Sequence, residues 1–402
     1  MPCRTLTAVF IAALLAIAPT APAGTLAEAV SAAVARADQG PRAEALRQQG
    51  LAVRTQADSL VAQDPALRVK HLSDRLNDDT GYYEWEAMVD LPVWLPGQRS
   101  ARRALADALG IQADALERYL RWELAGRVRE AAWAVALAEG HARLAEQALS
   151  DAKTLETQVT RRVSAGELAR VDLLLAQQEA LAREVERQTA RSDLDLAAQR
   201  FALLTDTRTL PVPLEEPVVH TPELPADHPG LAAAEANLAQ ARAERGRVAS
   251  ERRANPTLSL GGKRTRDNRD SDPYTALALE VSIPFGLGSQ SAPRLAEAER
   301  GYTDSATERK RLHRELETEL ALARTTYAAA KEALTLARRQ RTLAAEALGL
   351  MQRGFELGEI DLATLLRERT RAREAERAQE TKRLELGRAA ARLNQALGEV
   401  PL

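Results

Sequence analysis

The chain has 402 residues, of which 45% are hydrophobic, 28% are charged and only 3% are aromatic. Globular cores use more large rings, so this composition favours long helices and coiled coils. The formal net charge is -2 and the basic residues are scattered, which gives no reason to expect a nucleic acid partner.

The N-terminus has the features of a secretory signal peptide. Arg4 precedes an apolar run from Leu6 to Ile17, and Ala21-Pro22-Ala23 fits a cleavage site, so residues 1–23 are expected to be removed. The run is shorter than the ~20 residues of a membrane-spanning helix. Cys3, the only cysteine, would leave with the signal, so the mature protein is expected to be neither lipidated through Cys3 nor disulfide-bonded. No later segment is apolar enough for a transmembrane helix, and we expect any membrane crossing to use β-strands.

A helix and a β-hairpin are expected next. Pro41 opens a helical stretch that should end near Asp64-Pro65. Strands are predicted at about 66–76 and 82–93, around turn residues 77–81. In the second strand every odd position from Tyr83 to Val93 is apolar, with acids between them, which indicates one apolar face.

From Gln98 to about Val163 the chain has no proline, and apolar residues recur at helical spacing. Such a helix extends about 100 Å and needs partner helices to cover its apolar stripe. After a reversal at Gly166, a helix half as long is predicted to end near Leu204. A linker at 207–227 and a helix from Pro229 to Ala254 follow. Stacked end to end, the helix that ends near Leu204 and the helix from Pro229 to Ala254 would match the long helix in length.

The C-terminal half repeats this pattern at a constant shift of 192 positions. The segment from Leu91 to Gln98 aligns with Ile283 to Gln290, and Gly166-Glu167-Leu168 aligns with Gly358-Glu359-Ile360. One residue added to a packed helix rotates everything beyond it by about 100°, so the fixed spacing predicts rigid columns. The expected domains are a first repeat at 24–206 and a second at 228–402. Their β-hairpins are at about 66–93 and 256–285, and their helical hairpins at about 98–204 and 290–396.

The second strands of both hairpins alternate in the same phase. The positions predicted to face a membrane are Trp85, Val89, Leu91, Leu277, Leu279, Val281 and Ile283. Near-ten-residue strands with one apolar face and aromatic ends fit a membrane barrel wall. The same pattern fits an amphipathic hairpin on a soluble core equally well.

No catalytic or metal-binding pattern is found. The histidines are dispersed, without metal-ligand spacing: His71, His141, His220, His228 and His313. No nucleophile elbow, P-loop or dinucleotide fingerprint occurs. We therefore expect a protein that is not an enzyme, with no cofactor and no metal.

Four segments carry a family resemblance. They are Asn255-Pro256-Thr257-Leu258 before a strand, Ser282-Ile283-Pro284-Phe285 after one, and the reversals from Arg162 to Leu168 and from Arg353 to Ile360. In this order and spacing they resemble the TolC-type outer membrane efflux proteins, and look most like the heavy-metal and cation branch.

The resemblance implies a mainly α fold with a small β part and a homotrimer in the Gram-negative outer membrane. Each protomer would give four strands to a 12-stranded transmembrane β-barrel, and its helices to an α-helical barrel in the periplasm. Independently, four strands are too few to close a barrel, so a membrane protein of this kind must oligomerise. The implied function is the passive exit duct of a tripartite efflux or type I secretion system for metal cations or drugs.

The implied partners are a periplasmic adaptor, an inner-membrane RND or ABC pump, and outer membrane lipid. By position, the periplasmic tip that docks the adaptor would be Gly166, Glu167, Leu168, Asp172, Gly358, Glu359, Ile360 and Asp361. The strand-to-helix junctions would be Pro92, Gly97, Gln98, Pro284, Gly288 and Gln290. For Glu167 and Glu359, capping of the next helix is the alternative to a functional role. Asp172 and Asp361 are candidates to constrict the tip, although they align with Thr364 and Ala169 and not with each other.

Two other interpretations stay open at this point. One is a soluble periplasmic coiled-coil scaffold or chaperone whose hairpins cap the helices. The other is a periplasmic adaptor, although adaptors carry one helical hairpin in a β-domain, and this chain has two hairpins and little other β-structure.

Overall fold

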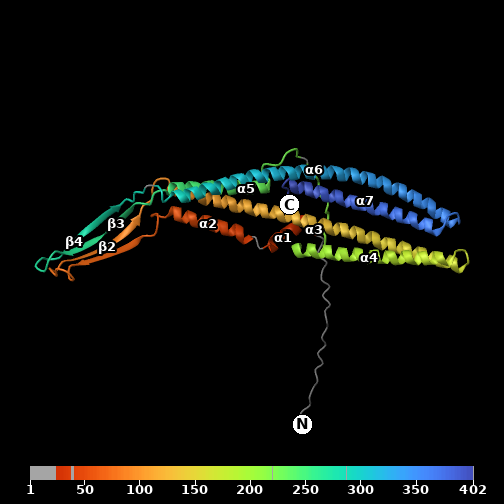
Figure 1. Ribbon diagram of the computed structural model, residues 1–402, viewed down its shortest axis with the longest axis horizontal. Coiled ribbons are helices and arrows are strands. Elements are labelled where there is room, and N and C mark those ends of the chain that lie inside the picture. Colours follow the sequence, from red (N-terminus) through yellow and green to blue (C-terminus); the bar gives the residue numbers. More distant parts are fainter. Residues whose placement is uncertain (1–23, 38–39, 220, 287, 402) are drawn as a thin grey trace, which may run out of the picture.

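The computed structural model describes residues 24–37, 40–219, 221–286 and 288–401. The predicted signal peptide, Cys3 and His220 lie outside the described residues. A long bundle of helices carries a β-sheet at one end and two helical reversals at the other (Figure 1). The helices are α1 (Leu26–Arg36), α2 (Gly40–Asp58), α3 (Gln98–Ser164), α4 (Arg170–Thr205), α5 (Pro229–Ser250), α6 (Ala292–Glu356) and α7 (Leu362–Ala396).

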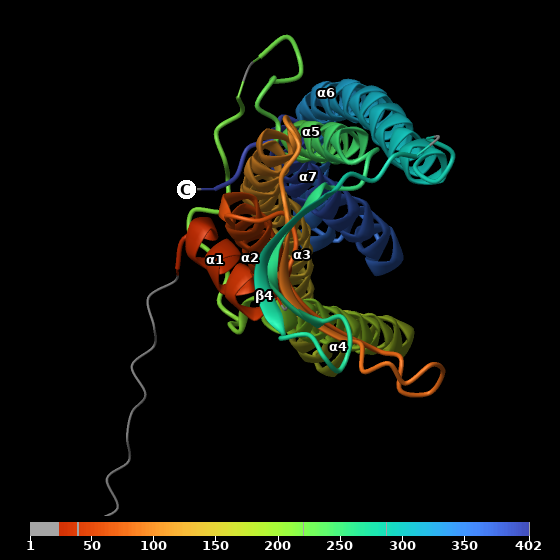
Figure 2. The ribbon, with the colours of Figure 1, turned by 90° about the vertical axis from the view of Figure 1, so that its left-hand side faces the viewer.

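Two helices, α3 of 67 residues and α6 of 65, run the length of the bundle. The shorter helices α2 and α4 pack along α3, and α5 and α7 pack along α6. Helix α5 also packs along α3, so the expected pairing of the long helix with the two shorter helices that follow it, α4 and α5, is present. In end-on view the elements follow an open arc with α6 and α4 toward its two ends (Figure 2). Among the described helices, none combines the length and the apolarity that a membrane-spanning helix requires.

Helix α1, which the sequence interpretation missed, fills the space between α2 and α4. It contacts both α3 and α4. Its Val30 joins Val128 of α3 and Phe201 of α4 in a core where all three are fully buried. Thr25 begins the helix with a complete capping box, in which its hydroxyl accepts the Glu28 N–H and the Glu28 carboxylate accepts the Thr25 N–H.

A four-stranded antiparallel sheet joins the two repeats in the order β1-β2-β3-β4. Its strands are β1 (Ala66–Ser73), β2 (Tyr83–Pro92), β3 (Thr257–Arg266) and β4 (Tyr274–Ser282). Strands β1 and β2 form the hairpin of the first repeat, and β3 and β4 form that of the second. The pairing of β2 with β3 over ten positions connects the two repeats. Consequently β1 and β4 are the two edges of the sheet.

Several element ends differ from the expected ones. The first helical stretch ends at Asp58 and not near Asp64, because the Ala62 N–H already donates to the Pro92 carbonyl at the base of the sheet. Strand β1 stops at Ser73, since the Asp74 carboxylate accepts the Thr80 N–H and closes the turn. Helix α6 starts at 292, two residues later than the repeat predicts.

The segment between the repeats is fixed to the middle of the bundle. The Arg129 side chain, 3% exposed, donates from Nε and Nη2 to both carboxylate oxygens of Glu216, at 2.9 and 2.6 Å. Its Nη1 donates to Gln395 Oε1 and to the Glu399 carbonyl. Asn394 accepts the Val219 N–H and donates to the Pro217 carbonyl. The chain between the repeats is thereby held to α3 and to the end of α7.

Candidate functional site

The two helical reversals have the same backbone geometry. Gly166 and Gly358 have φ angles of 79° and 78°, a region that favours glycine. In each turn the following residue, Glu167 or Glu359, donates its N–H to the carbonyl five residues earlier, at 2.9 and 2.8 Å. This is the Schellman arrangement that closes a helix C-terminus. The 192-residue shift thus relates the two turns bond for bond.

The two aspartates at the reversals each supply one half of a capping box. In the first turn, Asp172 at position N3 accepts the N–H of Ala169, at 3.1 Å. In the second, Asp361 at the N-cap accepts the N–H of Thr364, at 2.7 Å. Hydrogen bonding from Thr364 lowers the pKa of Asp361. The two acids are therefore not at equivalent positions, because they cap opposite ends of the same four-residue motif.

The Glu167 carboxylate makes no hydrogen bond to the first turn of α4 and is directed back along the chain. Its carboxylate pairs with Arg162 Nε at 3.1 Å. The Arg162 guanidinium also lies 5.0 Å from the centre of the Phe355 ring in the other reversal. Glu359 is exposed and has no hydrogen bond or ion pair to other described side chains. Arg162 therefore links the two turns, a contact that only the folded chain reveals.

A shared apolar cluster holds the reversals together. Its buried members are Leu155, Val159, Ala176, Phe355, Leu362 and Leu365. Leu168 and Ile360, both predicted site residues, pack against it and are partly buried. Gly166 and Gly358 are exposed at the end of the bundle. The predicted tip residues therefore converge on one end of the molecule, from both repeats.

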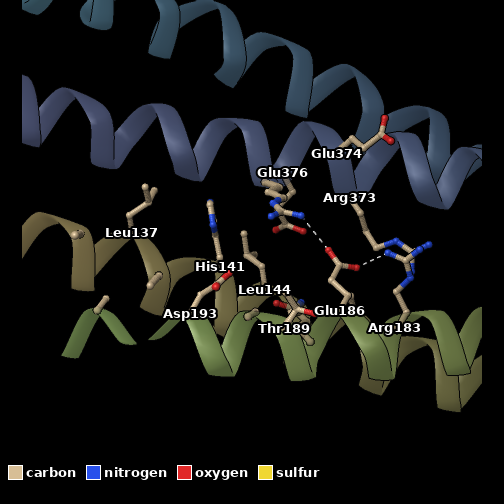
Figure 3. A pocket seen from close by; sticks show the side chains of 18 of the residues that line it. Leu137, His141, Leu144, Arg183, Glu186, Thr189, Asp193, Arg373, Glu374 and Glu376 are labelled. Atoms are coloured by element: carbon tan, nitrogen blue, oxygen red, sulfur yellow. Dashed lines mark hydrogen bonds and ion pairs between the residues drawn. The ribbon is translucent and has the colours of Figure 1, made fainter. Parts of the chain in front are cut away.

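A groove of about 800 Å³ lies between α3, α4 and α7, away from the reversals, and is lined by residues 134–151, 183–200 and 370–388 (Figure 3). Ion pairs bridge it from α4 to α7: Glu186 binds Arg377 at 3.1 Å, and Glu179 binds Arg373. Arg183 of α4 pairs with both of these glutamates. The sequence interpretation missed this array, although arginines at 369, 373 and 377 form a stripe at helical spacing that could have indicated it.

The sheet has two chemically different faces. Cross-strand register places Leu67, Val89, Leu260 and Leu279 in one row, and Val69, Ala87, Gly262 and Leu277 in the next. We call this the outward face; the leucines and valines of these two rows are 42–97% exposed. The opposite, inward face has charged side chains, with Glu84 bound to both Lys70 and Lys263, and Asp90 bound to Arg68. Trp85, Val89, Leu91, Leu277, Leu279 and Val281 all lie on the outward face, and Ile283 follows the end of β4.

The two strand-to-helix junctions are built differently. Gly97, with φ of 87°, precedes α3, and the buried Gln98 accepts hydrogen bonds from the Leu95 N–H and from Asn255 Nδ2. Gly288 has φ of 76°, but Gln290 is exposed and makes no hydrogen bond to a described residue. Pro92 ends β2, and Pro284 is exposed after β4. Pro293 lies in the first turn of α6, where its missing N–H costs nothing.

Within the described residues, no group of three or more histidine, cysteine or carboxylate side chains is arranged to hold a metal ion. His228 is buried as the N-cap of α5, and His141 Nε2 lies 3.0 Å from Thr381 Oγ1. Both have local structural partners on neighbouring elements.

Comparison with known proteins gives one family and one fold. Residues 222–399 match the family described as outer membrane efflux protein. No curated protein sequence matches the chain. Among solved structures, the outer-membrane channel OprN has a TM-score of 0.70 at 20% identity, covering 93% of this chain and 89% of its own. CusC, a transmembrane channel, has 0.72 at 14% identity, with coverage of 93% and 92%. The outer membrane protein VceC of Vibrio cholerae has 0.70 at 16% identity, with coverage of 93% and 96%.

Proposed function

Because residues 222–399 belong to the outer membrane efflux protein family and the whole chain has the fold of outer membrane channels, we propose that this protein is the outer membrane channel of a tripartite efflux or type I secretion system. It is a passive exit duct for small toxic solutes, metal cations or drugs, driven by an inner-membrane RND or ABC pump through a periplasmic adaptor. Membership of the cation branch stays a prediction.

One observation supports this function above the others, namely a sheet with an exposed apolar face and two open edges. Leu277 is 97% exposed, and Leu67, Leu279 and Val281 are 59–73% exposed on the same face. In water such a face and such edges would aggregate, which disfavours a soluble scaffold. In a bilayer the apolar face meets lipid, and the edges must be closed by other copies.

We propose that three copies close the sheet edge to edge, β4 of one protomer beside β1 of the next. The helices support the same assembly, because α6 and α4, which lie toward the two ends of the arc (Figure 2), each expose an apolar stripe. Helix α6 exposes Leu322, Leu336, Leu343 and Leu350, at multiples of seven residues, and α4 exposes Leu174, Leu181, Val185, Leu196 and Leu203. Heptad spacing is typical of a stripe that packs against another helix.

The unequal junctions point to specific neighbours. Gln98 binds Asn255, which precedes Pro256 and β3, within one chain. By the repeat, Gln290 corresponds to Gln98. In the hairpin register Ala66 pairs with Asp90 as Thr257 pairs with Ser282, so Asp64-Pro65 before β1 corresponds to Asn255-Pro256 before β3, at a shift of 191. Both Gln290 and Asp64 are exposed. We propose that Gln290 of one protomer meets Asp64 of the next, as Gln98 meets Asn255 within one chain.

Site-directed crosslinking in a Gram-negative host tests the proposed function. With D64C and Q290C in one chain, a short bis-maleimide is expected to give a covalent trimer in the outer membrane fraction. The mature chain is expected to lack other cysteines, so Q98C with N255C, which crosslinks within a chain, is the matched control. Recovery of the protein in the soluble periplasm without detergent, or a D64C/Q290C chain that stays monomeric in the membrane fraction, would contradict the proposal.

On the same basis we propose that the reversals at Gly166–Asp172 and Gly358–Thr364 form the periplasmic tip that docks the adaptor. Their support is the convergence of both turns on one exposed end, held by the Arg162–Phe355 contact. Gly97, Gln98, Gly288 and Gln290 then lie at the membrane boundary on the periplasmic side.

A further inference from the structure

The outward face of the sheet changes character toward the two hairpin loops. Register aligns His71, Trp85, Arg264 and Thr275 as one row across all four strands, directly beyond the row that ends in Leu277. The following row contains Ser73, Tyr83 and Arg266. Apolar rows therefore give way within one row to aromatic, cationic and hydroxyl side chains. In a membrane protein that is the composition of the boundary with lipid headgroups.

The position of this boundary fits one bilayer width. From Ile283 to Thr275 the outward face runs for eight residues, or about 26 Å at ~3.3 Å per residue. A strand tilt of about 40° reduces this to about 20 Å along the membrane normal, close to the ~25 Å apolar band of known barrels. The helices join the sheet at the Ile283 end, and the loops lie at the other end (Figure 1). With the helices in the periplasm, the row of Arg264 lies at the outer leaflet.

Arg264 is not used by the fold. Its side chain is exposed and makes no hydrogen bond or ion pair to any described residue. Its neighbour Lys263 points to the inward face, where its Nζ lies 2.6 Å from Glu84 Oε2. Arg266 donates to the carbonyls of Asn268 and Arg269 and is partly buried.

The surroundings of Arg264 favour an anion at the apolar boundary. The Thr275 hydroxyl is exposed beside it in the same row. Trp85 on its other side is stacked on His71, with ring centroids 4.1 Å apart. On the outward face these two rows contain no carboxylate; Glu84 and Glu86, which flank Trp85 on β2, alternate to the inward face, where Glu84 binds Lys263. Because β3 is an inner strand of the sheet, Arg264 stays exposed when copies join at β1 and β4.

We propose that Arg264, with Arg266 and the Thr275 hydroxyl, binds the phosphate group of outer-leaflet lipids, whose acyl chains lie along the apolar rows below. A guanidinium presents paired N–H donors that match phosphate oxygens. The stacked rings of Trp85 and His71 lie next to this site, at the depth of the lipid ester and headgroup region, where amphipathic rings are favoured. This lipid site rests on the proposed channel function, because it needs the outward face to be in a bilayer.

Lipid retention by the full-length mature protein tests the site. The protein is reconstituted in phosphatidylcholine vesicles that contain either one-fifth phosphatidylglycerol or one-fifth lipid A, extracted in mild detergent, and its retained lipids are counted by mass spectrometry. The wild type is expected to be enriched in phosphatidylglycerol or lipid A, whose phosphate charge is not balanced within the lipid as it is by the choline of phosphatidylcholine. R264Q is expected to lower that enrichment roughly fivefold, and R264Q/R266Q further, by the usual contribution of one cation near an anionic surface.

K263Q is the matched control, since it removes a charge one residue away on the inward face, and is expected to retain lipid as the wild type does. R264K/R266K, which keeps the charge, is expected to retain most of the enrichment. Equal retention by R264Q/R266Q and wild type, in protein that has entered the vesicles, would overturn the lipid site alone. Wild-type protein that does not enter vesicles would overturn the channel function and the site together.

Discussion

His228 is the buried residue whose protonation state the fold controls most strongly. It is 1% exposed, and its Nδ1 accepts the Gly230 N–H at 3.0 Å as the N-cap of α5. Its ring also meets Trp122 edge-on, with centroids 4.9 Å apart. Burial lowers the pKa of His228 to about 4. Since Nδ1 must be unprotonated to accept, protonation removes the cap at the point where the second repeat begins.

We therefore expect the start of α5 to lose stability in acid. The folded state disfavours the proton, so the stabilisation is complete above the unfolded pKa of about 6.5 and is lost as pH falls toward 4, by on the order of 3 kcal/mol. Amide hydrogen exchange in the first turn of α5, at pH 7 and at pH 4.5, measures this. H228N, whose amide oxygen can cap without titrating, should flatten the pH dependence. The exposed His313 as H313N is the control, and a wild-type profile in H228N would contradict the assignment.

At the same scale, sequence alone predicted some residues well and others poorly. The glycines of the reversals were predictable, because this way of ending a helix needs a residue with positive φ, which glycine adopts without strain. The roles of Asp172 and Asp361 were not, because a capping box needs the hydrogen-bond pattern to show which of its two positions each acid fills. Gln98 and Gln290 looked equivalent, but a partner for such a side chain lies outside the local sequence, and among the described residues only Gln98 has one, Asn255.

Among the elements, α3 and α6 were predictable nearly to the residue from spacing alone, since long helices with a continuous apolar stripe leave few alternatives. Helix α1 was missed because it is short and directly follows an apolar leader, although Thr25 and Glu28 have capping-box spacing. The late start of α6 follows from Pro293, which fits the first turn of a helix but not its interior. The ion pairs between α4 and α7 required the packing of the two hairpins.

Insertions distinguish rigid elements from the segment that joins the repeats. Four residues added after Ala131 shift everything beyond by one turn and displace the tip of one repeat relative to the other, so we expect export to fall. The same insertion after Pro222, in an exposed stretch, is expected to leave export close to wild type. Drug or metal resistance of the host, with protein levels checked by immunoblot, is the measurement.

Not every position in the segment between the repeats is expected to tolerate an insertion. Four residues inserted directly after Glu216 separate it from Val219, whereas Arg129 and Asn394 hold these two in place together. Breaking a buried pair by moving one partner costs about 3–5 kcal/mol. This third variant should therefore lower the amount of assembled protein. Equal tolerance at Ala131 and Pro222 would contradict the rigid-column interpretation.

For the whole molecule, the stripe on α6 should control assembly. Leu336 and Leu343 are 65% and 68% exposed in the single chain, so polar replacements cost the isolated protomer little. If they pack against α4 of a neighbour, L336Q/L343Q removes buried apolar surface at every protomer contact. Light scattering in detergent should then give a smaller trimer fraction for the variant than for wild type. L76Q, in an exposed loop of the hairpin, is the control, and an unchanged trimer in L336Q/L343Q would exclude this stripe from the interface.

The Gln98–Asn255 contact has a geometric consequence. Each chain contains one such contact between its own repeats, and Gln290 and Asp64 are exposed at either end. In the proposed trimer, three chains would therefore form a ring of six similar joints, each turning the wall by about 60°. Half of these joints would form during folding and half during association. A substitution that weakens the joint is therefore expected to reduce assembly before it affects folding. The joint between chains, unlike the one within a chain, has no connecting peptide that keeps its two halves close together.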